Sequence, residues 1–313
     1  MRHDKIFKSL DEQIDILKDK GLTIEDYDKA KNILFRENYF FVSGYRHLFM
    51  SDKKQSRFIE GTTFDELYAM LTFDRKVRNI FFSFILIIEN NMKSIISYQL
   101  SKKYGFKEKD YLNPANFTQD SMKTRQVRDI INKMKRQIRV NGVEHEATHH
   151  YLDNYGYVPL WILVKVLSFG IVSELYGILK YEDQVAIADI YDIDAETLTI
   201  FLSILANYRN ICAHEEVLYS HRSQRYIPDC RYHREMELEK DEYDEYKYGK
   251  NDLFAVVLIF KKLLTEEEFR DCMNQLNYEV DFLEGKVKTI PINTILNKCG
   301  FPDNWSSIVS IDK

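Results

Sequence analysis

The chain has 313 residues, of which 45% are hydrophobic and 30% charged, a balance that excludes an intrinsically disordered protein and is typical of a globular one. Its formal net charge of −5 argues against a protein that coats nucleic acid indiscriminately, so any contact with RNA has to come from a local basic patch. Only 11 glycines and 5 prolines are available for the tight turns of a β-rich fold, and this favours long helices.

The lack of a recognisable targeting signal and the spacing of the cysteines favour a cytoplasmic protein. The first residues, MRHDKIFKSLDEQ, lack the apolar segment and the small-residue cleavage site of a secretory signal. The longest apolar run, 80–88, is far shorter than the roughly 20 residues that a membrane span needs. The cysteines are widely spaced and form no CxxC pair: Cys212, Cys230, Cys272 and Cys299. We therefore expect a reduced, cytoplasmic protein without a membrane span.

The N-terminal third is predicted to be helical. Residues 5–20 and 24–36 have amphipathic periodicity and are separated by a break at Gly21, with Thr23 as the expected N-cap of the second helix. The aromatic segment 38–49 is predicted to contain turns. Thr63-Phe-Asp-Glu66 is a capping-box pattern that opens a helical stretch to about Leu100. At ~1.5 Å per residue this helix would be about 55 Å long, so we expect a bend or a break within it.

Residues 121–139 predict a helix with one apolar and one cationic face. On a helical projection Asn132 lies within a narrow stripe of arginines, and the aliphatic residues lie opposite. The arginines of this stripe are Arg125, Arg128, Arg136 and Arg139. Because the stripe is nearly free of carboxylates in an acidic protein, we interpret it as a phosphate-binding surface; a merely solvated face and an anionic membrane surface are the alternatives. Asn141-Gly142 is expected to end the helix.

The rest of the chain also predicts helices, so the fold class is all-α, a multi-helix bundle. Pro159 is expected to open a long helix on which Gly170 and Gly177 permit close approach by a neighbour. Further helices are predicted over 196–219, over 253–264, and after a second capping box at 265–268. The charged stretch 235–250 is interpreted as a surface loop or a frayed helix.

Two faces of the helix 201–219 have different character. One carries an aromatic and aliphatic stripe around Tyr208, as expected for a core face. The other carries small and polar residues at spacings of three and four, which would let a second helix pack closely: Ser203, Ala206, Asn210 and Ala213. Arg209 and His214 flank this seam but point about 140° apart on an ideal helix. A long arginine side chain or a second copy of the helix would close that gap.

Two further patterns involve a buried carboxylate and a histidine pair. Glu89 lies on an apolar helix face and needs a buried partner, for which Arg209, Arg75 and Arg78 are candidates; a structural ion pair is the favoured interpretation, ahead of a catalytic one. Residues 145–149 spell H-E-x-x-H, the zincin pattern, with Glu174 as a conceivable third ligand. That element follows an Asn-Gly turn and soon reaches Pro159, a poor context for a zincin helix, so a zinc metallopeptidase remains a remote alternative.

Arg209-Asn210-Ile-Cys-Ala-His214 resembles the R-N-x-x-x-H element of the HEPN superfamily, and the chain as a whole resembles the Abi-like family of bacterial abortive-infection proteins. The similarity includes, in the family's order, the segments 38–49, 73–96, 149–170, 209–219, 253–264 and 300–305. Two departures are Lys165, where the family commonly has an acidic residue, and Val217, where it often has arginine. The expected organisation is an N-terminal segment (1–60), a HEPN-like core (61–230) and a C-terminal extension (231–313).

The resemblance implies a metal-independent endoribonuclease that needs no cofactor and works as a homodimer with a composite site. The residue types suit this chemistry. Histidine titrates near neutral pH, so His214 can move protons between the ribose 2′-hydroxyl and the leaving oxygen. Arg209 can bind the scissile phosphate through its fork of donors, and the Asn210 amide can orient either group. Cleavage of RNA in phage defence, or as the toxin of a toxin–antitoxin pair, is the resulting hypothesis.

Two classes of function therefore stay open. One is a ribonuclease effector held in check by a protein or small-RNA inhibitor. The other is a non-catalytic HEPN protein that only binds RNA or a nucleotide with the same residues. The complete Arg-x4-His element favours the first, and a cleavage assay on total RNA separates the two.

Overall fold

A computed structural model describes residues 6–52 and 57–313 and has the predicted all-α class. Within these residues, β1(Met50–Asp52) and β2(Arg57–Phe58) pair in a two-stranded antiparallel sheet. The α-helices, in chain order, are α1(Leu10–Asp19), α2(Tyr27–Gly44), α3(Phe64–Tyr104), α4(Glu108–Tyr111), α5(Thr124–Glu144), α6(Glu146–Tyr155), α7(Leu160–Val166), α8(Phe169–Gly177), α9(Tyr181–Ala188), α10(Ala195–Ala213), α11(Arg231–Glu235), α12(Leu253–Leu263), α13(Glu266–Lys286) and α14(Ile292–Cys299). Short 3₁₀ turns are η1(Arg46–Leu48), η2(Pro114–Asn116), η3(Ser121–Lys123), η4(Asp189–Tyr191) and η5(Trp305–Ser310).

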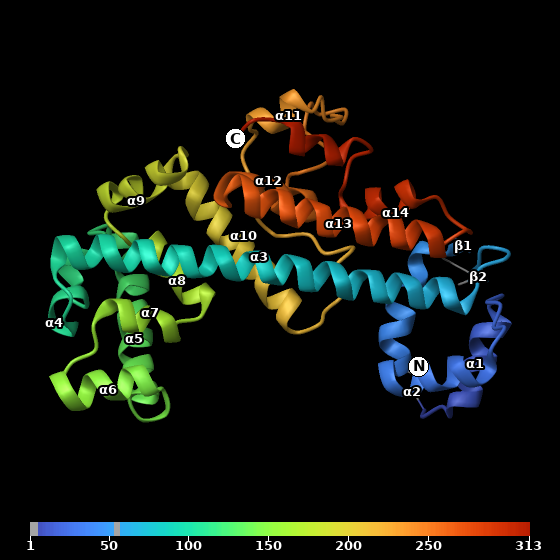
Figure 1. The fold of residues 1–313 in the computed structure, drawn as a ribbon, viewed down its shortest axis with the longest axis horizontal. Helices are drawn as coiled ribbons and strands as arrows, with labels where there is room; N and C mark the ends of the chain where they lie inside the picture. The colour runs from blue at the N-terminus through green and yellow to red at the C-terminus, as the bar shows by residue number, and fades with distance from the viewer. Residues whose placement is uncertain (1–5, 53–56) are drawn as a thin grey trace.

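The long helix α3 is the axis of the molecule (Figure 1). The capping box predicted at its start is present, because Thr63 accepts from the Glu66 N–H and Glu66 accepts from the Thr63 N–H. The predicted break is wrong: α3 is one helix of 41 residues. Its sequence contains neither glycine nor proline, the usual causes of a kink, before Gly105 ends it.

By length and composition α3 could also cross a membrane, and it is the one helix of the described residues that meets this test. Half of its most apolar stretch is buried inside the protein. The helices α7, α10 and α13 pack against it, which places it at the centre of the helical bundle.

The N-terminal helices begin and end differently from their prediction. The predicted start of the first helix, Lys5, lies outside the described residues, and α1 is capped by Ser9. The prediction of Thr23 as an N-cap is wrong, because Thr23 pairs with Thr63 in an isolated bridge. At the start of α2 the Lys29 N–H bonds to the Asp26 carboxylate instead (2.9 Å). Residues 38–44 of the aromatic segment continue α2 across a kink at Asn38, whose φ is 64°, and the rest of the segment contains η1.

The basic helix continues further than predicted. Asn141-Gly142 does not end α5, which extends to Glu144. A Cβ at Gly142 would lie 2.8 Å from Cδ1 of Leu152, so this glycine serves the close packing of α6 on α5. The predicted division of α5 into two faces is confirmed: Val127 and Met134 are buried, whereas the arginines of the stripe are exposed.

The helix expected after Pro159 is interrupted. It is divided into α7 and α8, because Leu167 has an extended conformation and Ser168 accepts from the Ile171 N–H as a new N-cap. The predicted close approach at Gly177 is wrong, since a Cβ there would meet open space. A Cβ at Gly170 would meet only the Ser168 hydroxyl, at 3.9 Å. The stretch 235–250 is irregular after the end of α11, as the sequence predicted.

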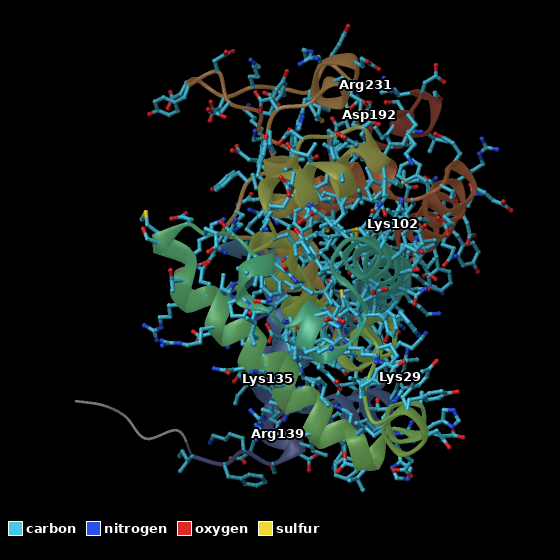
Figure 2. The ribbon with its side chains drawn as sticks, turned by 90° about the vertical axis from the view of Figure 1, so that its left-hand side faces the viewer. Lys29, Lys102, Lys135, Arg139, Asp192 and Arg231 are labelled. Atoms are coloured by element: carbon cyan, nitrogen blue, oxygen red, sulfur yellow. The ribbon has the colours of Figure 1, made fainter. Side chains whose placement is uncertain are left out.

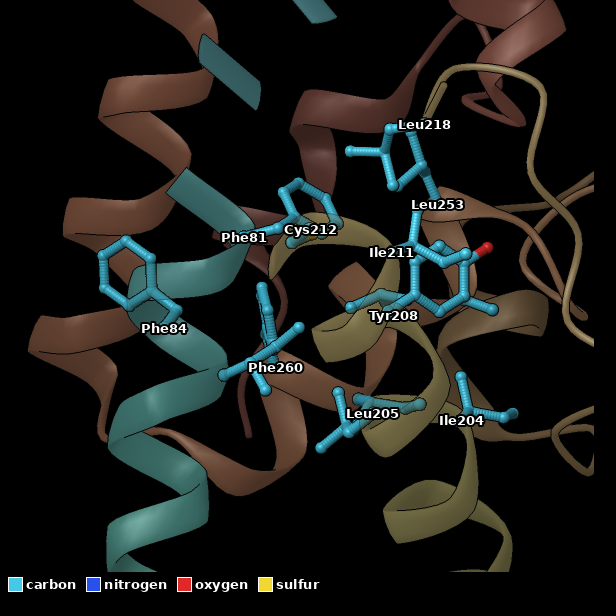
Figure 3. Packing of buried hydrophobic residues seen from close by; sticks show 14 of the residues in the cluster. Phe81, Phe84, Ile204, Leu205, Tyr208, Ile211, Cys212, Leu218, Leu253 and Phe260 are labelled. Carbon is cyan, nitrogen blue, oxygen red and sulfur yellow. The ribbon is translucent and has the colours of Figure 1, made fainter. Parts of the chain in front are cut away.

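The main core lies where α3, α10 and α12 meet (Figure 3). Phe260 of α12 packs against Phe81 and Phe84 of α3, with ring centroids 5.4 and 6.3 Å apart. The predicted core face of α10 is buried, including Leu205 and Tyr208. Residues from all three predicted segments belong to this one hydrophobic cluster, and the proposed boundaries at 60/61 and 230/231 remain a prediction.

Candidate functional site

The candidate site lies at the C-terminal end of α10. The predicted helix 196–219 is too long, because α10 ends at Ala213 and His214 is its C-cap. Glu215 follows with a left-handed φ of 54°, which turns the chain out of the helix. His214 and Asn210 are exposed, and in the described part of the chain the His214 imidazole has no hydrogen-bond or ion-pair partner. The His214 N–H still bonds to the Asn210 carbonyl (3.0 Å), and the 140° separation from Arg209 stays a prediction.

Arg209 is held by two residues of α3. Its guanidinium lies over the Phe82 ring, 5.6 Å from the centroid, and its Nε is 3.6 Å from Oε2 of Glu89. Among the predicted partners of Glu89, Arg209 is therefore confirmed. The sequence missed Lys93, whose Nζ is 2.7 Å from Oε1 of Glu89 one helical turn further along α3.

Glu89 and Arg209 form an ion pair without a hydrogen bond between the two side chains. Oε2 of Glu89 and Nε of Arg209 are both buried, and neither has a hydrogen-bond partner among the described residues. A separation of 3.6 Å exceeds a normal N–H···O distance, so the attraction between the two groups is mainly electrostatic. The Arg209 side chain is still 29% exposed, and its terminal donors remain available to an anion.

A pocket of about 500 Å³ opens beside Glu89. We call it the Glu89 pocket. It is lined from α3 by Leu86, Glu89, Asn90, Lys93, Ser94 and Ser97, and from α7 by Trp161, Val164 and Lys165. Its volume is in the range of small-molecule sites, about 300–1,000 Å³. The pocket thus combines two lysines, a buried carboxylate and a tryptophan.

A buried network fixes the segment that follows His214. The Asp74 carboxylate accepts from the backbone N–H groups of Leu218 (3.0 Å) and Tyr219 (2.7 Å). It also accepts from the Tyr45 hydroxyl (2.8 Å) and from Arg78 (2.5 Å). Arg78 in turn donates to the carbonyl of Glu216 (3.0 Å), so both members of the ion pair hold the chain that leaves α10.

Two predicted supporting residues are therefore not at the Arg209 site. Arg78 belongs to the network with Asp74, and Arg75 forms a two-point ion pair with Glu37 of α2 (2.5 and 3.1 Å). Asp74 itself was missed. Its spacing of four from Arg78 on the apolar face of FDRKVRNIF is the pattern that could have indicated a buried pair.

The arginine stripe is a separate surface. Figure 2 shows α5 along one edge of the molecule, with Lys135 and Arg139 on it. One of its arginines, Arg125, faces a carboxylate, at 3.7 Å from Asp129. The Glu89 pocket is lined by α3 and α7 and not by α5, so the stripe and the Arg209 site are distinct surfaces of one chain.

The H-E-x-x-H pattern does not form a zinc site. His145 is the N-cap of α6, where its Nδ1 accepts from the Thr148 N–H (3.3 Å). His149 contacts the Gly142 carbonyl through Nδ1 (3.1 Å) and Asp153 through Nε2 (3.1 Å). Within residues 6–52 and 57–313 no group of three or more His, Cys, Asp and Glu side chains could hold a metal ion. Glu174, the conceivable third ligand, pairs with a lysine of α5.

The predicted small-residue seam of α10 is only partly free. Asn210 and Ala213 are exposed, but Ala206 is 9% exposed and belongs to the core, and Ser203 lines a second pocket between α5 and α8. Cys212, on the same last turn, is no candidate nucleophile, because burial raises the pKa of its thiol to about 12.

A family model described as Abi-like protein matches residues 32–220, more than half of the chain and all of the candidate site residues. No curated protein and no solved structure matches.

The network around Asp74 makes a first prediction. Asp74→Ala leaves the Arg78 guanidinium buried without its counter-charge and two backbone N–H groups without an acceptor. We expect a loss of about 3–5 kcal/mol in the free energy of unfolding, measured by urea denaturation. Hydrogen exchange at Leu218 and Tyr219 should accelerate even where the variant stays folded.

The matched control is Asp281→Ala, at an exposed position of α13, which should change the free energy of unfolding by less than about 0.5 kcal/mol. Equal effects of the two substitutions would contradict the role given to Asp74.

Proposed function

The chain belongs to the Abi-like protein family, which links it to abortive infection, and from this premise we propose that it is a ribonuclease whose catalytic pair is Arg209 and His214. The observation that carries the proposal is the end of α10. It presents an exposed imidazole without a partner and, one turn earlier, a guanidinium that Glu89 and Phe82 hold in position. A proton carrier and a fixed cation, here both at the end of α10, are the groups that cleavage of a phosphodiester needs.

The proposed reaction is an internal transfer on RNA. His214 takes the proton of a ribose 2′-hydroxyl while the 2′-oxygen forms a bond to phosphorus. The bond from phosphorus to the 5′-oxygen breaks, and an imidazolium returns a proton to this leaving oxygen. Arg209 stabilises the negative charge that builds on the phosphate, and Asn210 orients the imidazole or the phosphate through its amide. The products are a 2′,3′-cyclic phosphate and a 5′-hydroxyl, and the proton balance needs no metal ion.

Glu89 is proposed as a positioning residue. Its carboxylate draws the Arg209 side chain toward α3, and Lys93 offsets part of its charge. Because Glu89 and Arg209 are not hydrogen-bonded to each other, the terminal N–H groups of the guanidinium remain free to donate to another group. They can turn to a phosphate.

We further propose that the protein acts as a homodimer in the cytoplasm, under restraint by a protein or a small structured RNA. The exposed end of α10, with Asn210 and Ala213, would be the contact between copies. Two such ends placed together would bring two imidazoles to one cleft, so that one can accept and the other donate a proton. A non-catalytic protein that binds RNA or a nucleotide with the same residues remains the second candidate.

The catalytic assignment predicts that His214→Ala lowers RNA cleavage by at least about 100-fold, the smaller end of what general acid–base groups contribute. Growth inhibition on expression in bacteria should be relieved in parallel. The parent should leave 2′,3′-cyclic phosphate ends and keep its activity in EDTA. The measurement is end-group analysis of cleaved total RNA.

His47→Ala is the matched control, because it removes an exposed histidine of η1, which belongs to neither the proposed site nor the arginine stripe. It should leave cleavage unchanged. Loss of activity in EDTA with rescue by zinc, or a fully active His214→Ala variant, would refute the assignment.

The arginine stripe predicts a weaker and less salt-dependent association with RNA when its charges are removed. The slope of log affinity against log salt concentration should fall by ~0.7–0.9 for each phosphate that the variant no longer neutralises. Affinity is measured by fluorescence anisotropy at several salt concentrations. The variant carries glutamine at Arg125, Arg128, Arg136 and Arg139.

The control variant has the same reduction of charge on other exposed surfaces. It carries glutamine at Arg234, Arg270, Lys286 and Lys288. If both variants lower the slope equally, the stripe is only a solvated face.

The dimer proposal predicts that Ala213→Arg separates the copies and abolishes cleavage together, because a long charged side chain replaces a methyl group at the contact. Mass is measured by light scattering and helix content by circular dichroism. Ala206 is unsuitable for this test, since it lies in the core of its own chain. Ala186→Arg, at an exposed position of α9, should change neither property. A parent protein that is a fully active monomer would overturn the composite site.

A further inference from the structure

The helices α4, α6 and α7 lie at one end of the molecule (Figure 1). A continuous track of aromatic rings links these helices. We call it the aromatic track. Its rings come from the link between α3 and α4, from α6, from the link between α6 and α7, and from α7. They are Phe106, His150, Tyr151, Tyr155, Tyr157 and Trp161.

Each ring of the track lies within contact distance of the next. The centroid of Trp161 is 5.7 Å from that of Phe106, and Phe106 is 5.8 Å from Tyr157. Tyr157 is 6.4 Å from Tyr155, which is 5.3 Å from Tyr151. The planes are tilted by 33–58° along this path, so the rings form a stepped surface.

Phe106, His150, Tyr155 and Trp161 are exposed to solvent, whereas Tyr151 and Tyr157 between them are half-buried. Phe106 is 39%, Trp161 41% and Tyr155 58% exposed. Aromatic side chains contribute most to stability when they are buried, so a contiguous exposed set usually marks a binding surface.

The charged groups along the track are complementary to an anion. Lys107 lies over the Tyr157 ring, 4.9 Å from its centroid, and Lys165 is exposed next to the Trp161 end. Two carboxylates of these elements, Glu108 and Asp153, are engaged with the protein itself. Glu108 accepts from the Val158 N–H (2.7 Å), and Asp153 contacts His149. Cations beside exposed rings match the alternating phosphates and bases of an unpaired strand.

The track leads to the candidate site. Trp161 belongs both to the track and to the lining of the Glu89 pocket, and Lys165 lines the same pocket. Glu89 faces Arg209 across 3.6 Å. A strand that lies on the rings would therefore reach the pocket next to the arginine of the proposed catalytic pair.

We infer that the aromatic track binds unpaired nucleotide bases by stacking and guides a single strand of RNA to the Glu89 pocket. This inference rests on the proposed ribonuclease function and defines its substrate class. A duplex is excluded from the track because its bases are already stacked and cannot reach the rings. The track should distinguish single strands from duplexes but should discriminate little between base sequences, since every base can stack on an aromatic ring.

The experiment uses an oligodeoxythymidylate of roughly 12 nucleotides, within the ~4–16 that single-strand platforms cover. It lacks the 2′-hydroxyl, so it can be bound but not cleaved. Stacking on Trp161 should quench the indole fluorescence of the parent protein; the second tryptophan, Trp305, is only 6% exposed. Trp161→Phe should keep the affinity and lose the quenching, because phenylalanine still offers a ring.

Tyr155 supplies the matched variants, because at 58% exposure its truncation should leave the fold intact. Tyr155→Ala should weaken binding of the single strand by about 5-fold to 100-fold, and Tyr155→Phe should restore it. Tyr243→Ala, which removes a tyrosine that is 78% exposed outside the track, should bind as the parent does. Circular dichroism and urea denaturation confirm that each variant is folded.

The outcomes separate this inference from the proposed function. If the parent cleaves RNA but Tyr155→Ala binds and cleaves equally well, the track is overturned and the ribonuclease stands. If the parent cleaves nothing but Tyr155→Ala loses the single strand, the track stands and the ribonuclease fails. If Tyr155→Ala weakens binding of the matching duplex as much as binding of the single strand, the track is overturned. A changed mass of Tyr155→Ala in light scattering, with oligonucleotide binding intact, also overturns it and identifies a protein contact.

Discussion

The Asp74 carboxylate is the point on which the geometry of the candidate site depends. It is 1% exposed and receives donors from three separate parts of the chain: the Tyr45 hydroxyl, the Arg78 guanidinium and the backbone of Leu218 and Tyr219. Burial of a charge is costly unless every lone pair is satisfied, and here each oxygen has a strong donor. The same interaction joins the N-cap of η1, α3 and the segment after α10, so it holds the chain that follows His214.

The helix α3 connects the Asp74 network to the candidate site. Asp74 and Glu89 both lie on it, and because the helix is unbroken their separation is fixed. The first carboxylate holds the chain that leaves α10, and the second draws Arg209 toward the bundle. The two residues of the proposed pair are thus each positioned by the same rigid element. A site supported by a helix keeps its geometry better than one carried by loops alone.

The two nucleic-acid surfaces that we propose have different physical bases. The arginine stripe of α5 would act through charge, which attracts any phosphate backbone and weakens with salt. The aromatic track would act through stacking, which requires unpaired bases. In this proposal the arginine stripe attracts any RNA strand, and the aromatic track binds only a strand whose bases are unpaired. The Glu89 pocket adjoins the track and is not lined by the stripe, which places selection next to the proposed chemistry.

Local sequence patterns were sufficient to predict the helical class, the capping boxes at Thr63 and Thr265, the two faces of α5 and the buried face of α10. These features depend on neighbours within a few residues, so periodicity and local side-chain bonds suffice. The sequence also indicated Arg209 as a partner of Glu89, because an apolar helix face demands a partner for a carboxylate.

The ends of the helices and the pairing of the charges depend instead on tertiary contacts. The last turn of α10 stops at Ala213 because the following segment is bound by Asp74, which lies more than a hundred residues earlier. No local pattern contains that bond. In the same way α5 passes through Gly142 because α6 packs against it, and the aromatic track exists because helices and links from separate parts of the chain meet at one end of the bundle. Long-range contacts outweigh the small local preferences that a sequence displays.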